Sequence, residues 1–134
     1  MTEPRAIRFV ETDLEAVAEA TGRVAVFVTA SGKLDQLARR ANRLTRGALE
    51  RFAESDAFEK MSVGDAAEMA WPAGMHAEAL IVVKLDRRPK VADARRAGGS
   101  VGARAGDGPV LVLAGNLRNV EDVALGAVLR DYSF

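Results

Sequence analysis

Residues 98–102 read GGSVG, which matches the G-x-S-x-G spacing of the nucleophile elbow that exposes a catalytic serine. Such a serine stands on a sharp turn directly after a strand and needs a histidine and an acid nearby. Ser100 instead falls inside a stretch that we expect to be helical. The single histidine, His76, belongs to a loop beside Pro72 and Gly74. The sequence therefore favours packing as the role of these glycines over covalent catalysis.

Two segments have features of a phosphate-binding loop. Residues 98–102, with Gly106 and Gly108, are rich in glycine, but the dinucleotide fingerprint must follow a strand and open a helix. These glycines are predicted within and at the end of a helix. Residues 113–119 are better placed, because they join a strand to a helix N-terminus that could hold an anion. One glycine and two asparagines are weak evidence, and an ordinary strand-to-helix turn is favoured.

Metal-ligating residues are sparse. A catalytic metal site needs three or more convergent His, Asp or Glu ligands, and the scattered carboxylates show no such spacing. Glu54, Asp56 and Glu59 are close in sequence, but we expect them in a solvated loop. The chain contains no cysteine, which excludes disulfides, zinc–cysteine sites and thiol catalysis. The sequence predicts no catalytic, cofactor-binding or metal-binding residue in this chain.

Trp71 and a group of arginines are candidate interaction residues. Trp71, the only tryptophan, could anchor an interface or fill the core at the end of a strand, and the core is favoured. Arg39, Arg40, Arg43 and Arg46 lie off the apolar stripe of a predicted helix. They could form a partner-binding patch, but the solvated face of an amphipathic helix is the favoured interpretation.

Composition narrows the classes of protein further. The 134 residues include 19 basic and 19 acidic side chains, so the net charge is zero, which disfavours a nucleic-acid or membrane surface. The first eight residues lack the apolar segment of a signal peptide, and the apolar runs are too short to span a bilayer. One domain of a cytoplasmic protein is predicted.

Hydrophobic patterning predicts alternating strands and helices. Strands are predicted at residues 6–10, 23–30, 66–71, 78–85 and 109–115, and helices at 14–20, 33–53, 89–105 and 119–131, with a loop at 58–64. The glycines of 98–102 suggest a helix face pressed closely on a sheet, and Asn119 with Asp122 resembles a capping box. This order indicates a mostly parallel central sheet, with a possible antiparallel edge, covered by helices.

Four stretches, in this order along nearly the whole chain, resemble the N-terminal domain of the leucyl aminopeptidase (cytosol aminopeptidase) family. They are LTRGALERFAESDAFEKMSVGDAAEM, WPAGMHAEALIVVKL, ARRAGGSVGARA and VALGAVLRDYSF. The last is the most specific, because it looks like the helix that precedes the linker to the catalytic domain. One departure is Lys84 to Arg87, which replaces the Gly-rich turn that the family has after this strand.

The resemblance implies a macro-domain-like fold, a three-layer α/β/α sandwich with a mixed, mostly parallel sheet. Residues 1–134 would be a single non-catalytic domain that serves subunit assembly or regulation. A catalytic domain beyond residue 134 would hold two divalent metal ions, zinc or manganese, and release N-terminal amino acids from peptides. The expected partners are that catalytic domain and further subunits of a homo-hexamer, with Tyr132 and Phe134 at the domain junction. Some family members bind DNA, which the balanced charge disfavours here.

A second hypothesis is a stand-alone macro-like domain that binds a nucleotide or ADP-ribose. It would use strand-to-helix loops such as Ser31-Gly32 and residues 115–119. No glycine-rich phosphate loop in the right place supports it.

Overall fold

The computed structural model describes residues 7–10, 14–106 and 108–131. Its strands are β1 (Ile7–Val10), β2 (Arg23–Val28), β3 (Ala66–Ala70), β4 (Ala79–Lys84) and β5 (Val110–Leu113). Its helices are α1 (Leu14–Glu19), α2 (Gln36–Leu44), α3 (Ala48–Ala53), α4 (Asp56–Lys60), α5 (Val91–Ala103) and α6 (Val120–Asp131). Every predicted strand is present within two residues at each end, and the alternation of strands and helices is confirmed.

The five strands form one mixed sheet in the order β1-β5-β2-β4-β3. Neighbours among β1, β5, β2 and β4 are parallel, and β3 runs antiparallel beside β4 at one edge. The mostly parallel sheet with an antiparallel edge is therefore confirmed. Because parallel strands point the same way, β2, β4 and β5 end at one common edge, where open sheets of this kind bind ligands.

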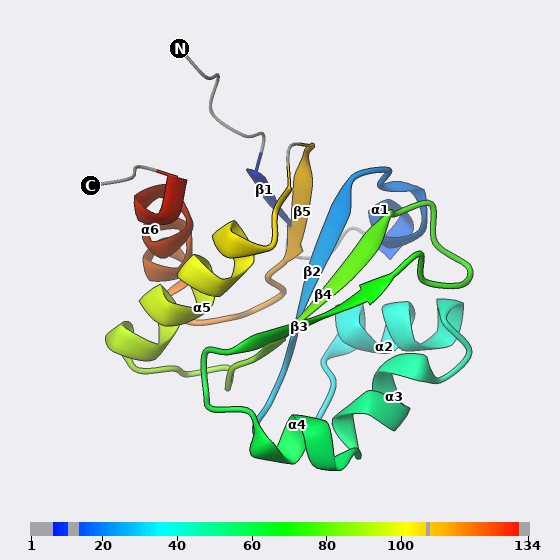
Figure 1. The fold of residues 1–134 in the computed structure, drawn as a ribbon, viewed down its shortest axis with the longest axis horizontal. Coiled ribbons are helices and arrows are strands. Elements are labelled where there is room, and N and C mark those ends of the chain that lie inside the picture. The colour runs from blue at the N-terminus through cyan, green and yellow to red at the C-terminus, as the bar shows by residue number, and fades with distance from the viewer. Residues whose placement is uncertain (1–6, 11–13, 107, 132–134) are drawn as a thin grey trace.

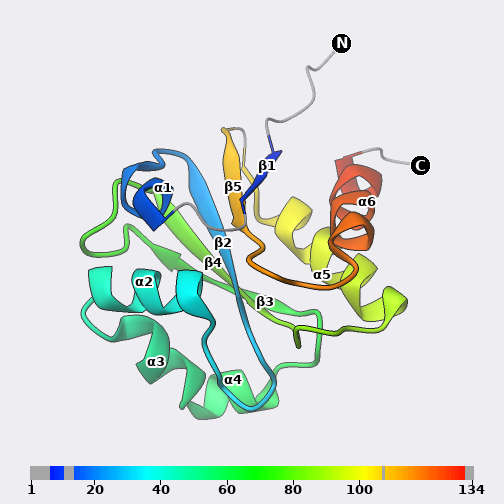
Figure 2. The same cartoon turned by 180° about the vertical axis from the view of Figure 1, so that it is seen from behind.

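Helices cover both faces of the sheet (Figures 1 and 2). In β2, Val24, Val26 and Val28 join a core cluster that includes side chains of α1 to α4. Ala25 and Phe27 join a second cluster with α5 and α6 on the opposite face. A strand buried on both faces needs apolar residues throughout, which explains the continuous apolar runs of β2, β4 and β5. The predicted three-layer α/β/α architecture is confirmed.

The single helix predicted over residues 33–53 is wrong, because two helices, α2 and α3, occupy this stretch. Arg46 and Gly47 adopt positive φ angles of 56° and 83°, which a right-handed helix cannot contain. The Asn42 side chain accepts a hydrogen bond from the Glu50 N–H at 2.9 Å and so satisfies a free donor of α3. The apolar stripe continues across this break, so periodicity alone did not reveal it.

The loop predicted at residues 58–64 contains the end of a short helix, α4. Ser55 caps its N-terminus by accepting the Phe58 N–H at 3.2 Å. Lys84, at the end of β4, caps the C-terminal end of α4. This lysine is buried, with only 6% of its surface exposed. Its ammonium donates to the carbonyl oxygens of Phe58, Glu59 and Met61 at 2.9, 3.3 and 2.9 Å. A five-residue helix gives too short a periodic signal to predict from sequence.

One glycine of α5, Gly98, presses on a helix rather than on the sheet, which corrects that prediction. A Cβ added to Gly98 would overlap the Val123 carbonyl oxygen of α6, and one added to Gly126 would overlap the Arg95 carbonyl oxygen of α5. Gly99, the next residue, faces open space. Two glycines therefore let α5 and α6 approach closely.

The capping box predicted at the start of α6 is wrong. Asn119 has a φ of 59°, whereas a capping residue has extended backbone. Its side-chain amide donates to the Pro89 carbonyl at 2.8 Å, and the Asp122 carboxylate accepts from Arg95 Nε at 3.2 Å. Both side chains therefore bind the segment 89–95 and help to hold α6 against it.

Candidate functional site

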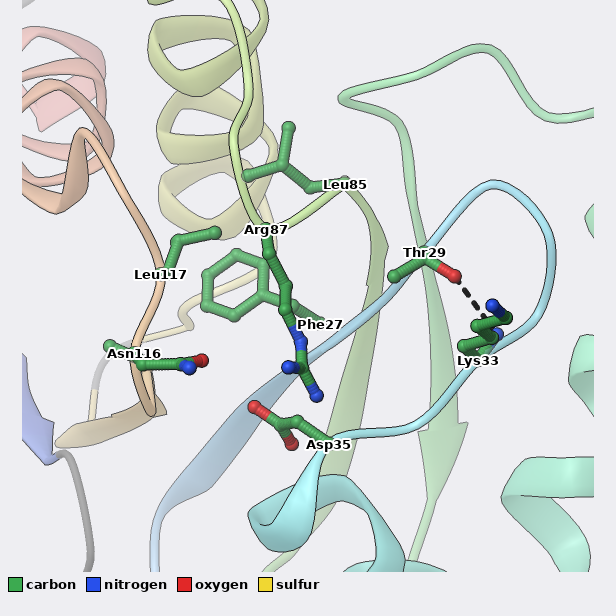
Figure 3. A pocket seen from close by; sticks show the side chains of 9 residues that line it. Phe27, Thr29, Lys33, Asp35, Leu85, Arg87, Asn116 and Leu117 are labelled. Carbon is green, nitrogen blue, oxygen red and sulfur yellow. Dashed lines mark hydrogen bonds between the residues drawn. The ribbon is translucent and has the colours of Figure 1, made fainter.

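The candidate ligand site of this fold is the edge at which β2, β4 and β5 end. A hollow of about 10 Å³, called here the strand-end hollow, lies at this edge. It is lined by Phe27, Thr29, Lys33, Asp35, Leu85, Arg87, Ala114, Asn116 and Leu117 (Figure 3). A space of this size accommodates about one water molecule.

Apolar side chains fill the place where an enclosed pocket would be. Phe27 and Leu85 are 7% and 1% exposed, and Figure 3 shows Leu117 beside them. Two wider depressions adjoin the hollow and share Arg87 with it, but both open to solvent. Organic ligands are usually enclosed in pockets of roughly 300–1,000 Å³. The enclosed hollow is therefore too small for a nucleotide, and the two depressions of about 560 and 770 Å³ have the volume but are open to solvent.

Charged groups of both signs, Lys33, Asp35 and Arg87, line the hollow. Asp35 caps α2 with its own carboxylate, and a Cβ added to Gly115 would lie 2.6 Å from Asp35 Oδ2. Figure 3 shows Arg87 extending toward Asp35 from the other side. Glu121 and Asp122 occupy the first turn of α6, where they oppose a bound phosphate. The Asp35 carboxylate beside Gly115 therefore disfavours the anion site considered at residues 113–119.

The two loops proposed for nucleotide binding do come together at this edge. Ser31-Gly32 lines one open depression, and Gly115 with Asn116 lines the other. Hydrogen bonds fix the loops: the Lys33 N–H donates to Thr29 Oγ1 at 2.9 Å, and the Arg118 N–H donates to the Arg87 carbonyl at 2.8 Å. The sequence placed these loops but did not reveal Asp35 and Arg87 between them.

The residues considered for a nucleophile elbow are separated. Ser100 lies in the C-terminal half of α5, and its hydroxyl donates to the Gly64 carbonyl at 2.7 Å. His76 is exposed, and its backbone N–H donates to the Ala18 carbonyl of α1, on the opposite face of the sheet. Gly106 packs beside the guanidinium of Arg23 rather than in a phosphate loop. Packing accounts for Gly98, which contacts α6, whereas Gly99 faces open space.

The acidic residues considered as metal ligands are exposed. Asp56 and Glu59 lie in α4 rather than in the expected loop, and Glu54 is the residue that follows α3. Within residues 7–10, 14–106 and 108–131, no three His, Asp or Glu side chains form a group that could hold a metal ion. In the same part of the chain, no helix is long and apolar enough to span a membrane.

The arginine cluster lies mostly at the surface. Arg39, Arg43 and Arg46 are exposed, whereas Arg40 is partly buried and its Nε has no hydrogen-bond partner in the described part of the chain. The ion pairs found among the described residues involve the cations Arg23, Arg95 and Arg96. None of them joins a carboxylate to the arginine cluster.

The prediction that Trp71 fills the core is wrong, because its side chain is 75% exposed. It has a φ of 49°, in the left-handed region, at the turn between β3 and β4. The next residue, Pro72, is buried instead of Trp71. The Pro-Gly signal after the strand indicated this turn and could have indicated exposure as well. Tyr132 and Phe134, expected at a domain junction, lie outside the described residues.

The sequence is similar to cytosol aminopeptidases over its full length. It is 48% identical over 134 residues to a probable cytosol aminopeptidase of Cereibacter sphaeroides and 46% identical to one of Dinoroseobacter shibae. The chain spans only 27% and 28% of the length of these curated relatives, at their N-terminal end. The resemblance to the N-terminal domain of this family is therefore confirmed. No protein-family model matches the sequence.

The fold is similar to that of a macrodomain. The macrodomain of Mycobacterium tuberculosis DarG superposes with a TM-score of 0.67, covering 95% of this chain and 90% of that one. The sequences are 16% identical, so the likeness concerns the fold alone. The macro-like α/β fold is confirmed.

Proposed function

Because the chain corresponds to the N-terminal part of cytosol aminopeptidases, we propose that it is the N-terminal domain of a longer leucyl aminopeptidase and serves subunit assembly or regulation. One observation carries this proposal: 48% identity extends over all 134 residues but over only 27% of the relative. Residues 1–134 then form one domain, and the remainder of the polypeptide supplies the chemistry. The name of the relatives supports a location in the cytosol.

The chemistry of the parent enzyme follows from its class. A catalytic domain beyond residue 134 would hold two divalent metal ions, zinc or manganese, which activate water for attack on the first peptide bond. The residues of this domain would position and contact other parts of the enzyme, and they would not bind the metal ions. Its polar side chains fit this role, since Lys84, Ser100 and Asn119 all bind backbone carbonyls inside the fold.

Hydrolysis of leucine anilide substrates tests the assignment of catalysis to the remainder of the polypeptide. We expect the full-length polypeptide to release the anilide in the presence of manganese or zinc, and residues 1–134 alone to release none. A metal-free sample of each protein is the control. Metal-stimulated turnover by pure residues 1–134 would contradict the proposal.

The alternative function, binding of ADP-ribose, is favoured only by the meeting of two loops at the strand-end hollow. We expect calorimetric titration of residues 1–134 with ADP-ribose to give no saturable heat, because apolar side chains occupy the enclosed space. A characterised ADP-ribose-binding macrodomain is the positive control. Saturable micromolar binding that Arg87→Gln weakens would instead favour the alternative.

A further inference from the structure

Trp71 is both exposed and conformationally strained. Its side chain is 75% exposed, the largest exposed fraction among the large apolar residues described. A positive φ is unfavourable for a bulky residue, and glycine or asparagine would adopt the observed 49° more readily. Neither core packing nor backbone preference therefore explains tryptophan at this position. Strain of this kind persists where the surroundings impose it, and it is often found at sites of function.

The turn that carries Trp71 is firmly anchored. The Trp71 N–H donates to the Glu78 carbonyl at 2.8 Å, and the His76 N–H donates to Ala18 of α1 at 3.0 Å. Pro72 is buried in the protein. The exposed indole is thus held by a rigid turn, which limits the conformational entropy lost on binding.

Two exposed arginines lie beside this turn. Gly74, three residues after Trp71, packs against the backbone of Leu44, and a Cβ there would lie 2.9 Å from the Leu44 carbonyl carbon. The C-terminal end of α2 is therefore next to the turn, as Figure 1 also shows. Arg43 and Arg46 are exposed at that end, and no described carboxylate pairs with them. Tryptophan and arginine are the residue types most enriched among interface hot spots.

We propose that Trp71, Arg43 and Arg46 form a docking surface for a carboxylate-bearing surface of a neighbouring subunit in the assembled enzyme. The inference rests on the proposed assembly function and assigns it to named residues. The indole would fill an apolar contact on the partner, and the guanidinium groups would pair with its carboxylates. Charge complementarity favours an acidic protein partner over a second copy of this same surface, since two arginine-bearing surfaces would repel each other.

The position of this surface favours another subunit over the remainder of the same polypeptide. The remainder would follow α6, which packs on the face of the sheet opposite to α1 to α4 (Figures 1 and 2). The turn after β3 packs on the α1–α4 face, where Met75 and Ala77 join the core cluster. The docking surface therefore lies away from α6, after which the chain would continue.

Assembly of the full-length polypeptide tests the inference. Trp71→Gly removes the indole and relieves the strained backbone, so we expect the thermal midpoint of the dissociated subunit to be unchanged or higher. Its subunit dissociation constant, measured by light scattering over a dilution series, should rise at least about tenfold. Trp71→Asn, which also tolerates a positive φ, repeats the test if the glycine variant is poorly folded. Val91→Ser, at an exposed apolar residue on α5, is the matched control.

The arginine contribution is tested in the same dilution series. Arg43→Glu should weaken assembly, and the effect should shrink in about 1 M salt, where the screening length is roughly 3 Å. Arg88→Glu, at an exposed arginine outside the docking surface, should leave assembly unchanged.

Four outcomes are distinguishable. Weakened assembly with both surface variants and not with the controls supports the inference. Unchanged assembly with both surface variants overturns the inference and leaves the assembly function standing. A full-length polypeptide that is monomeric at every concentration overturns the assembly function and the inference together. Unchanged assembly with loss of affinity for a labelled oligonucleotide overturns the inference in favour of nucleic-acid binding.

Discussion

Replacing Lys84 by methionine is expected to lower the free energy of unfolding by about 3 kcal/mol. The Lys84 ammonium donates to three carbonyl oxygens at the end of α4 and lies 4.8 Å from the centre of the Phe58 ring. Methionine keeps the length of the side chain but leaves these carbonyls without their donor. Hydrogen bonds to a charged group are worth about 1.5–3 kcal/mol each, and part of this is offset because the buried charge disappears.

Urea unfolding at neutral pH measures this effect. Lys60→Met is the matched control, because Lys60 is exposed at the C-terminal end of the same helix. Its replacement should cost no more than about 0.5 kcal/mol. If Lys84→Met lowered stability no more than the control, the buried lysine would not be holding α4 against β4.

A second pair of variants is expected to move stability in opposite directions at adjacent residues. Gly98→Ala should destabilise by about 2–3 kcal/mol, since the new methyl group would overlap the Val123 carbonyl and lie 2.8 Å from the Ala127 nitrogen. Gly99→Ala should stabilise by roughly 0.5–1 kcal/mol, because its methyl group meets nothing within 4 Å and alanine is the better helix former.

Both variants replace glycine by alanine, and they do so at neighbouring positions of the same helix. Each is therefore the control for the other. Thermal unfolding should place Gly98→Ala below the parent chain and Gly99→Ala above it. Equal effects at the two positions would contradict the close packing of α5 on α6 through Gly98 and Gly126.

The framework of the fold could be predicted because strands buried on both faces leave a strong signal. The apolar runs of β2, β4 and β5 are more continuous than a strand with one solvent-exposed face requires. The helices that separate these strands along the chain predict that the strands pair in parallel. Long-range contacts were not predictable. Lys84 meets α4 across 23 to 26 residues of sequence, and Gly98 of α5 meets α6 rather than the sheet.

The candidate site was harder to predict than the fold. The sequence placed the loops at Ser31-Gly32 and 115–119 but not the apolar side chains of Phe27 and Leu117 that close the space between them. The position of Trp71 at the end of a strand favours the core, whereas the turn directs this residue outward. The break between α2 and α3 follows from local backbone angles that an apolar stripe does not encode.

A macro-like fold and the sequence of an aminopeptidase domain lead to different expectations for function. The fold alone would favour a nucleotide at the strand-end hollow, but function follows the site rather than the fold. Here the enclosed space has a volume of about 10 Å³. The most exposed large apolar residue described, Trp71, lies elsewhere. The proposed assembly function within a larger enzyme would reconcile the macro-like architecture with the relatives.

The mass of the polypeptide that contains this domain tests the central claim most directly. An antibody raised against residues 1–134 would capture the protein from its source cells for intact mass measurement. The account predicts a polypeptide between three and four times the 14.3 kDa of this chain, since the chain spans 27% of its relative. A polypeptide of 14.3 kDa would contradict it, because the domain would then act without a catalytic partner on the same chain.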